Sequence, residues 1–287
     1  LREAVYQRLA YHFQFHNELK LFAEIHHVTK FSVNIYRGYG NEANFYHIAN
    51  LFMPHTVYEC FSHDGFGAVP GIKDDGNAWG TAGHSSRIVH VDNDILSLFA
   101  NLFDEEGTSA IQARLPALHA HELASVLRKF SRNPLRLNDI NGSYFTTVMF
   151  DETYAQLGGI IKRETVFPNT AEQLILSGPH FYVANPFYKT PRNICTLNSH
   201  YDCIELENLS DKYLPRTNYL PLKSNAQIQE GVPKVVWIER GKTVAKFVTD
   251  YFRLAVRKRL SQSGERTLIP MILPQNVGHI LTVNAAV

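Results

Sequence analysis

The sequence has no apolar run approaching the roughly 18 residues that a membrane-spanning helix needs, so we expect no membrane partner. Cysteine is also scarce. The three cysteines, Cys60, Cys195 and Cys203, are odd in number, and their spacing matches no zinc motif and no paired disulfide framework. Unpaired thiols are typical of reducing compartments, so we expect a cytoplasmic protein.

The chain has almost no net charge, +1 over 287 residues, but the charge is unevenly placed. Between Lys212 and Arg266 there are 12 lysines and arginines against 4 acidic residues, which leaves the remainder of the chain acidic. Such a basic segment fits either a surface that contacts a polyanion or an ordinary solvated helix. With 45% hydrophobic and 19% charged residues, the composition is that of a globular protein with one large core or two medium ones.

Motifs for metal-dependent or nucleophilic chemistry are missing as well. There are 14 histidines, but we find no set with the spacing of the roughly four ligands of a zinc site. Glu18-Leu19-Lys20 matches the end of a nuclease motif, yet only Glu3 precedes it, so we treat the match as chance. No Gly-x-Ser-x-Gly turn occurs. We therefore predict no metal site and no catalytic residue in this chain.

Hydrophobic spacing predicts an α+β protein: a mixed helical segment followed by a β-rich segment from about residue 144. The longest predicted helix covers residues 243–260, because its apolar residues recur every three or four positions. The other predicted helices cover residues 2–15, 45–52, 56–61, 94–103, 108–130 and 171–176. The predicted strands cover residues 19–25, 30–36, 87–91, 144–150, 181–184, 203–207, 234–238, 267–273 and 279–283.

The most informative segment is Ser177–Arg192. It begins as a hydrophobic stretch and ends in two proline turns that present Lys189, Thr190 and Arg192. Core packing does not require basic and hydroxyl side chains in that order, and turns on a rigid scaffold are good places for binding residues.

Three segments together resemble the large single-chain adenine-N6 DNA methyltransferases, which include type IIG restriction–modification enzymes and related phage-defence methylases. They are Tyr11–Phe22 with Lys30–Tyr36, then Ser177–Arg192, and then Glu265–Pro274. The resemblance implies three parts. Residues 1–40 would be the last helix and hairpin of the catalytic domain, residues 41–142 a mainly helical linker, and residues 143–287 a truncated target-recognition domain. Because the chain begins with Leu1, we expect it to be a piece of a longer polypeptide.

The residues that would perform methyl transfer in that family are not found here. Gly65-Phe66-Gly67 has no predicted strand before it and no helix after it, so it is not a cofactor loop. Asn185-Pro186-Phe187 lacks the second proline of the family's Asn-Pro-Pro-aromatic motif. The resemblance therefore implies a fragment that is inactive alone. Its partners would be double-stranded DNA and the catalytic domain of the same parent chain, where S-adenosylmethionine would bind.

DNA recognition needs cations for phosphates and polar side chains for base edges. The alternatives from the residues alone are that Arg192 pairs with Asp202 or Glu205, that Asn218 caps a turn, and that Arg266 forms a structural ion pair. Arg253, Arg257, Lys258 and Arg259 would form a phosphate-binding face at the end of the predicted helix over 243–260. The candidate DNA-binding residues are Lys189, Thr190, Arg192, Asn193, Arg216, Asn218, Arg253, Arg257, Lys258 and Arg266.

A different function also fits the sequence. The 12% aromatic content and the near-neutral overall charge are compatible with a protein–protein platform in a phage-defence complex. The salt dependence of binding distinguishes DNA recognition from a protein–protein platform. Binding through phosphates weakens steeply as the salt concentration rises, whereas binding through an apolar interface does not.

Overall fold

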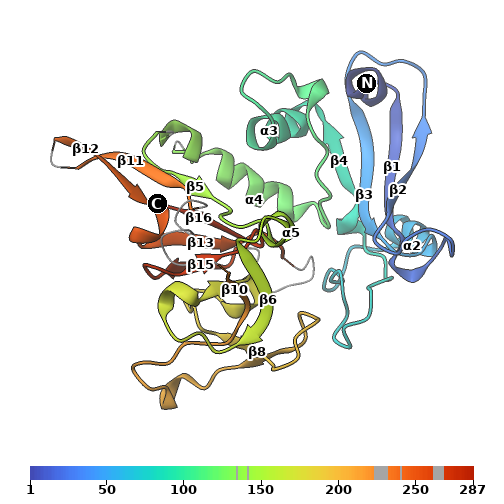
Figure 1. Ribbon diagram of the computed structural model, residues 1–287. Helices are drawn as coiled ribbons and strands as arrows, with labels where there is room; N and C mark the ends of the chain where they lie inside the picture. Colours follow the sequence, from blue (N-terminus) through green and yellow to red (C-terminus); the bar gives the residue numbers. More distant parts are fainter. Residues whose placement is uncertain (134, 141, 223–231, 240, 261–267) are drawn as a thin grey trace. The chain divides into compact units, whose positions relative to one another are not determined.

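The computed structural model describes residues 1–133, 135–140, 142–222, 232–239, 241–260 and 268–287 (Figure 1). The chain divides into two compact units, unit 1 over Leu1–Arg136 and unit 2 over Leu137–Val287. Both contain helices and strands, which confirms the α+β class.

Unit 1 is built on one four-stranded sheet in the order β2-β1-β3-β4. The two central strands, β1 and β3, run parallel, and each edge strand pairs antiparallel with its neighbour. The strands are β1 (Leu9–His16), β2 (Lys30–Tyr36), β3 (Asn44–Leu51) and β4 (Val89–Asp92). The helices are α1 (Arg2–Tyr6), α2 (His55–Ser62), α3 (Asn93–Phe103) and α4 (Glu122–Ser131).

The helix α3 forms where the sequence predicts it, and its N-terminus is capped by Asp92, whose carboxylate accepts a hydrogen bond from the Ile95 N–H at 2.9 Å. Its apolar stripe, which includes Leu96 and Phe99, packs into a core with Phe45 and Val91 of the sheet. Local spacing and a side-chain cap are sufficient to define this helix.

Two other helix predictions in unit 1 are wrong. Residues 2–15 form only the single turn α1 before the strand β1, and residues 45–52 form the strand β3. Successive residues Ile48 and Ala49 of β3 are both fully buried, because the second half of this central strand is covered on both faces, whereas Tyr46 in its first half is exposed. A strand buried on both faces reads as a continuous apolar run, which spacing alone does not distinguish from a helix.

The predicted boundary near residue 40 falls within this sheet, since β1 pairs with β3 along Tyr11–Phe15. Residues 1–40 and the start of the predicted linker therefore share one structural unit. The functional names given to the three predicted parts stay predictions.

Gly83 lies close against the helix α2 in unit 1. A Cβ atom at this position would lie 2.4 Å from Glu59 Cβ and 2.6 Å from the Cys60 backbone nitrogen of α2. We expect Gly83→Ala to lower the free energy of unfolding by about 1–3 kcal/mol, because either the helix or the loop must move. Gly38→Ala is the control, as nothing lies within 4 Å of its added Cβ. Equal urea midpoints for the two variants would contradict this packing.

Unit 2 consists of several small sheets around two cores. The largest sheet has the order β14-β13-β16-β5, and four two-stranded pairs join β10 to β6, β11 to β12, β15 to β7 and β8 to β9. The first part contains β5 (Thr146–Thr147), α5 (Glu152–Leu157), β6 (Ile161–Val166), β7 (Ile175–Leu176), β8 (Lys189–Pro191), β9 (Tyr201–Cys203) and β10 (Thr217–Pro221). The second part contains β11 (Lys234–Glu239), β12 (Lys242–Phe247), β13 (Arg253–Arg257), β14 (Pro270–Leu273), β15 (Gly278–His279) and β16 (Val283–Ala286).

The longest predicted helix, over 243–260, is wrong. These residues form most of β12, a 3-10 turn and β13, the last of which pairs with β14 on one side and β16 on the other. Residues 181–184 also form no strand, only a bridge between Tyr182 and Asn185. The strand prediction over 234–238, which rests on its β-branched and aromatic residues, is confirmed, since these residues form β11 of the β11–β12 hairpin.

Candidate functional site

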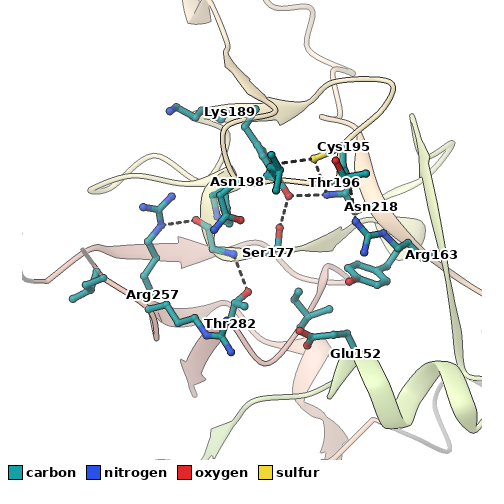
Figure 2. Close-up of a pocket in the computed structure, with 18 residues that line it drawn as sticks. Glu152, Arg163, Ser177, Lys189, Cys195, Thr196, Asn198, Asn218, Arg257 and Thr282 are labelled. Atoms are coloured by element: carbon teal, nitrogen blue, oxygen red, sulfur yellow. Dashed lines mark hydrogen bonds between the residues drawn. The ribbon is translucent and has the colours of Figure 1, made fainter. Parts of the chain in front are cut away.

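A cavity of about 570 Å³ opens within unit 2 (Figure 2). Its walls come from α5, β6, β8, β10, the end of β13 and the loops at 177–179, 195–198 and 280–282. This volume lies in the range of about 300–1,000 Å³ that is typical of ligand sites. The lining residues are Glu152, Arg163, Ser177, Gly178, Pro179, Lys189, Cys195, Thr196, Leu197, Asn198, Tyr201, Asn218, Tyr219, Arg257, Arg259, Leu260, Ile280 and Thr282.

The cavity is strongly cationic. Arg163, Lys189, Arg257 and Arg259 line it, and Glu152 is the single carboxylate among the lining residues. Across the part of the chain that the structure describes, no ion pair joins any of these four cations to a carboxylate. Their charges are therefore available to an anionic ligand.

Two hydrogen bonds between its backbone and side chains fix Gly178 in the cavity wall. The Arg257 Nε–H donates to the Gly178 carbonyl at 2.6 Å, and the Gly178 N–H donates to the Thr282 hydroxyl at 3.0 Å. The Arg257 guanidinium also lies 5.7 Å from the centroid of the buried Phe181 ring. Partial burial lowers the pKa of Arg257 from its ordinary value, so this cation is held against the wall rather than being fully solvated.

A buried hydrogen-bond chain supports the floor of the cavity. The Asn218 amide donates to the Tyr201 hydroxyl at 2.8 Å, and that hydroxyl lies 2.8 Å from Ser177 Oγ. Ser177 Oγ lies 3.0 Å from His180 Nδ1, and His180 Nε2 donates to the Arg216 carbonyl at 2.9 Å. Burial raises the pKa of Tyr201 to about 12 and lowers the pKa of His180 to about 4. At ordinary pH these hydrogen-bonded side chains are therefore uncharged, and their hydrogen bonds fix the floor of the cavity.

The contact between Ser177 and His180 is structural rather than nucleophilic. His180 is fully buried, and its Nδ1 accepts a hydrogen bond from the Ser177 backbone N–H in a capping box at a short 3-10 turn. Its other nitrogen is bound to a backbone carbonyl, so no carboxylate orients the ring as a general base.

Four of the sequence-predicted residues line this cavity: Lys189, Asn218 and Arg257 of the candidate DNA-binding residues, and Arg259 of the predicted phosphate-binding face. Asn218 is buried in β10 and belongs to the floor rather than capping a turn, since its carbonyl oxygen accepts from the Thr165 hydroxyl at 2.8 Å. Lys189 is half-buried at the start of β8.

The other predicted residues lie outside the cavity. Arg192 forms an exposed ion pair with Asp202 at 2.9 Å, as the alternative interpretation predicted. The Thr190 hydroxyl accepts from the Arg216 N–H, and the Arg216 guanidinium stacks on the Phe167 ring 4.3 Å away. Asn193 and Lys258 are exposed. Arg266 lies outside the described residues.

The structure corrects the prediction for Arg253. This side chain is 0% exposed, and its Nη2 donates to the carbonyls of Pro274 and Val277 at 3.1 and 2.5 Å. Burial lowers the pKa of Arg253 to about 10. In this conformation the guanidinium ties two backbone segments together and is not available to a DNA phosphate. The phosphate-binding helix face does not exist, because these arginines lie on a strand.

Sequence reasoning missed Arg163 and Glu152. Arg163 extends from β6 and donates through Nη2 to the Cys195 carbonyl at 3.0 Å. Glu152 begins α5, about a hundred residues before Arg257 along the chain. Neither residue lies in a motif, and only the folded chain brings them into the same cavity as Lys189 and Arg257.

Comparison with known proteins gives no relative: no family model and no curated protein matches the chain. Among the described residues, no group of three or more histidine, cysteine or acidic side chains is placed to hold a metal ion. No helix in the described part of the chain is long and apolar enough to span a membrane.

Proposed function

We propose that unit 2 binds duplex DNA and serves as the specificity part of an adenine-N6 DNA methyltransferase of a restriction–modification system. The observation that carries the DNA-binding part is the cavity whose lining contains four cations and one carboxylate. The methyltransferase part rests on the sequence resemblance of the three segments described above. Methyl transfer from S-adenosylmethionine would belong to a catalytic domain outside this chain.

Charge is the first support for the proposal. Four cations on the walls of one cavity repel one another, and among the described residues they have no carboxylate partner within ion-pair distance. A phosphate backbone relieves that repulsion and releases condensed counterions, which is the main sequence-independent source of DNA affinity.

Polar groups beside the cations are the second support. Thr196 and Asn198 are exposed on the 195–198 loop at the cavity wall. Amide and hydroxyl groups of this kind read base edges once phosphate contacts fix the register. The rigid floor of Ser177, Tyr201 and Asn218 would keep this wall in place.

The test is a fluorescence-anisotropy titration of the chain with random duplex DNA at 50 and 200 mM salt. If three or four phosphates are neutralised, we expect the affinity to fall about 40- to 150-fold between the two salt concentrations. An affinity that does not change with salt would contradict binding through phosphates, and so would the absence of binding at 50 mM.

A second candidate function, a protein–protein platform, is favoured by one observation in unit 1. Val33 and Ile35 of β2 are 49% and 47% exposed, and they pair across the sheet with Phe13 and Tyr11. Paired residues share a face of the sheet, and on this face Val33 and Ile35 are exposed beside the buried Phe13, so they form the open apolar edge of the core that contains Phe13. Binding of a protein there would persist at high salt.

A further inference from the structure

One carboxylate oxygen in the cavity has no partner. Glu152 Oε2 is shielded from solvent, and no described group donates a hydrogen bond to it. The carboxylate nevertheless lines the same cavity as Arg163 and Arg257 (Figure 2). Buried polar atoms are nearly always hydrogen-bonded, and an ionised carboxylate can only accept. The other oxygen, Oε1, is not shielded in this way and also accepts no hydrogen bond from a described group, so it is the oxygen to which a ligand in the cavity can donate.

The surroundings of Glu152 restrict the chemistry of that ligand. A simple anion such as phosphate suits the four cations but would meet repulsion from the carboxylate. A simple amine suits Glu152 but would meet repulsion from the cations. A ligand with an anionic group at one end and a hydrogen-bond donor at the other satisfies both.

We propose that the cavity accommodates one nucleotide whose base carries an exocyclic amino group. Glu152 accepts a hydrogen bond from that amino group, and Lys189, Arg257 and Arg259 hold the phosphate. Carboxylates accept from the amino group of cytosine in the same way at base edges. Thymine is excluded, because its N3–H is flanked by two carbonyl oxygens that would repel the carboxylate. This inference deepens the proposed DNA binding and rests on it only where the nucleotide comes from DNA.

The nucleotide that this cavity binds has two sources: a free nucleotide, or a nucleotide extruded from a DNA duplex. The free source is tested by titrating the chain with dCMP and dTMP and following the affinity by calorimetry. The DNA source is tested with two duplexes that differ only in a single bulged nucleotide, dC or dT, because a bulge makes extrusion cheap. We expect the cytosine ligand to bind about tenfold or more tightly than the thymine ligand in at least one of the two pairs.

The variant Glu152→Gln removes the charge and keeps the shape of the side chain. We expect it to bring the cytosine-to-thymine ratio close to one, chiefly by weakening the cytosine ligand. Glu164→Gln is the matched control, since Glu164 lies on the neighbouring strand β6, pairs with Lys162 and does not line the cavity. This control should keep the wild-type ratio.

The outcomes separate this inference from the proposed function. A preference for cytosine in either pair, lost in Glu152→Gln and kept in Glu164→Gln, supports the nucleotide site and identifies its source. Equal affinities for cytosine and thymine ligands in the wild-type chain overturn it, whether or not the variants fold. Salt-dependent binding of unbulged duplex would then remain, and the proposed DNA binding would stand without a nucleotide site.

Discussion

Acidification from pH 7 to pH 5.5 is expected to lower the free energy of unfolding of unit 2 by about 2–3 kcal/mol, because two histidines are buried in the neutral form. His180 and His279 are each 0% exposed. Burial lowers the pKa of His180 to about 4 and that of His279 to about 3. Both values lie well below the value of about 6.5 in an unfolded chain.

The sign follows from which state binds protons. Below pH 6.5 the unfolded chain protonates both rings while the folded chain does not, so acid favours unfolding. The stabilisation is complete above pH 6.5 and is lost as the pH falls toward 4 and 3, at about 1.4 kcal/mol per pH unit for each ring. Nearby arginines reinforce the effect, since Arg257 opposes a charge on His180 and Arg253 opposes one on His279.

Urea unfolding at pH 7.0 and 5.5 measures this loss. The chain has two tryptophans, Trp79 in unit 1 and Trp237 in unit 2, so a Trp79→Phe background assigns the fluorescence change to unit 2. In that background, His279→Leu should halve the difference between the two pH values, because one of the two titrating rings is gone. Equal unfolding free energies at both pH values in the parent chain would contradict the neutral buried histidines.

Local sequence patterns predict those elements of this fold whose boundaries are set locally. The helix α3 carries its own cap at Asp92, and the strand β11 pairs with β12, the strand that directly follows it. The segment 243–260 fails for the opposite reason. Its apolar residues recur every three or four positions, yet β13 pairs with β14 and β16, which lie later in the chain. Those distant partners bury Arg253 and Ala255 on one side of the strand and leave Leu254 exposed on the other.

The candidate site was predictable in part. The turn chemistry of the Ser177–Arg192 segment singled out Lys189, and the basic segment singled out Arg257. The sequence pattern does not show that these residues line one cavity with Arg163 and Glu152. That arrangement depends on how β6, α5 and β13 pack in three dimensions. The same charge count also included Arg253, because counting cations does not distinguish a buried guanidinium from one that faces a cavity.

Charge reversal at Arg259 is expected to weaken DNA binding about tenfold or more and to reduce the salt dependence by about one phosphate contact. Arg259 lines the cavity, its side chain is exposed, and no described residue forms an ion pair or hydrogen bond with it. Arg259→Glu should therefore change the charge of the cavity without disturbing the fold. The measurement is the anisotropy titration with random duplex DNA at 50 and 200 mM salt.

Lys258→Glu is the matched control, and it decides where DNA binds. Lys258 is the preceding residue, is equally exposed and undergoes the same change of charge, but it does not line the cavity. Salt at 200 mM weakens the effect of a charge that does not contact the DNA, so we expect Lys258→Glu to weaken binding less than threefold. Equal losses for the two variants would mean that the whole basic surface holds DNA without a defined site. A loss with Lys258→Glu alone would place the phosphates beside Lys258, just after the end of β13, and would leave the cavity to another ligand.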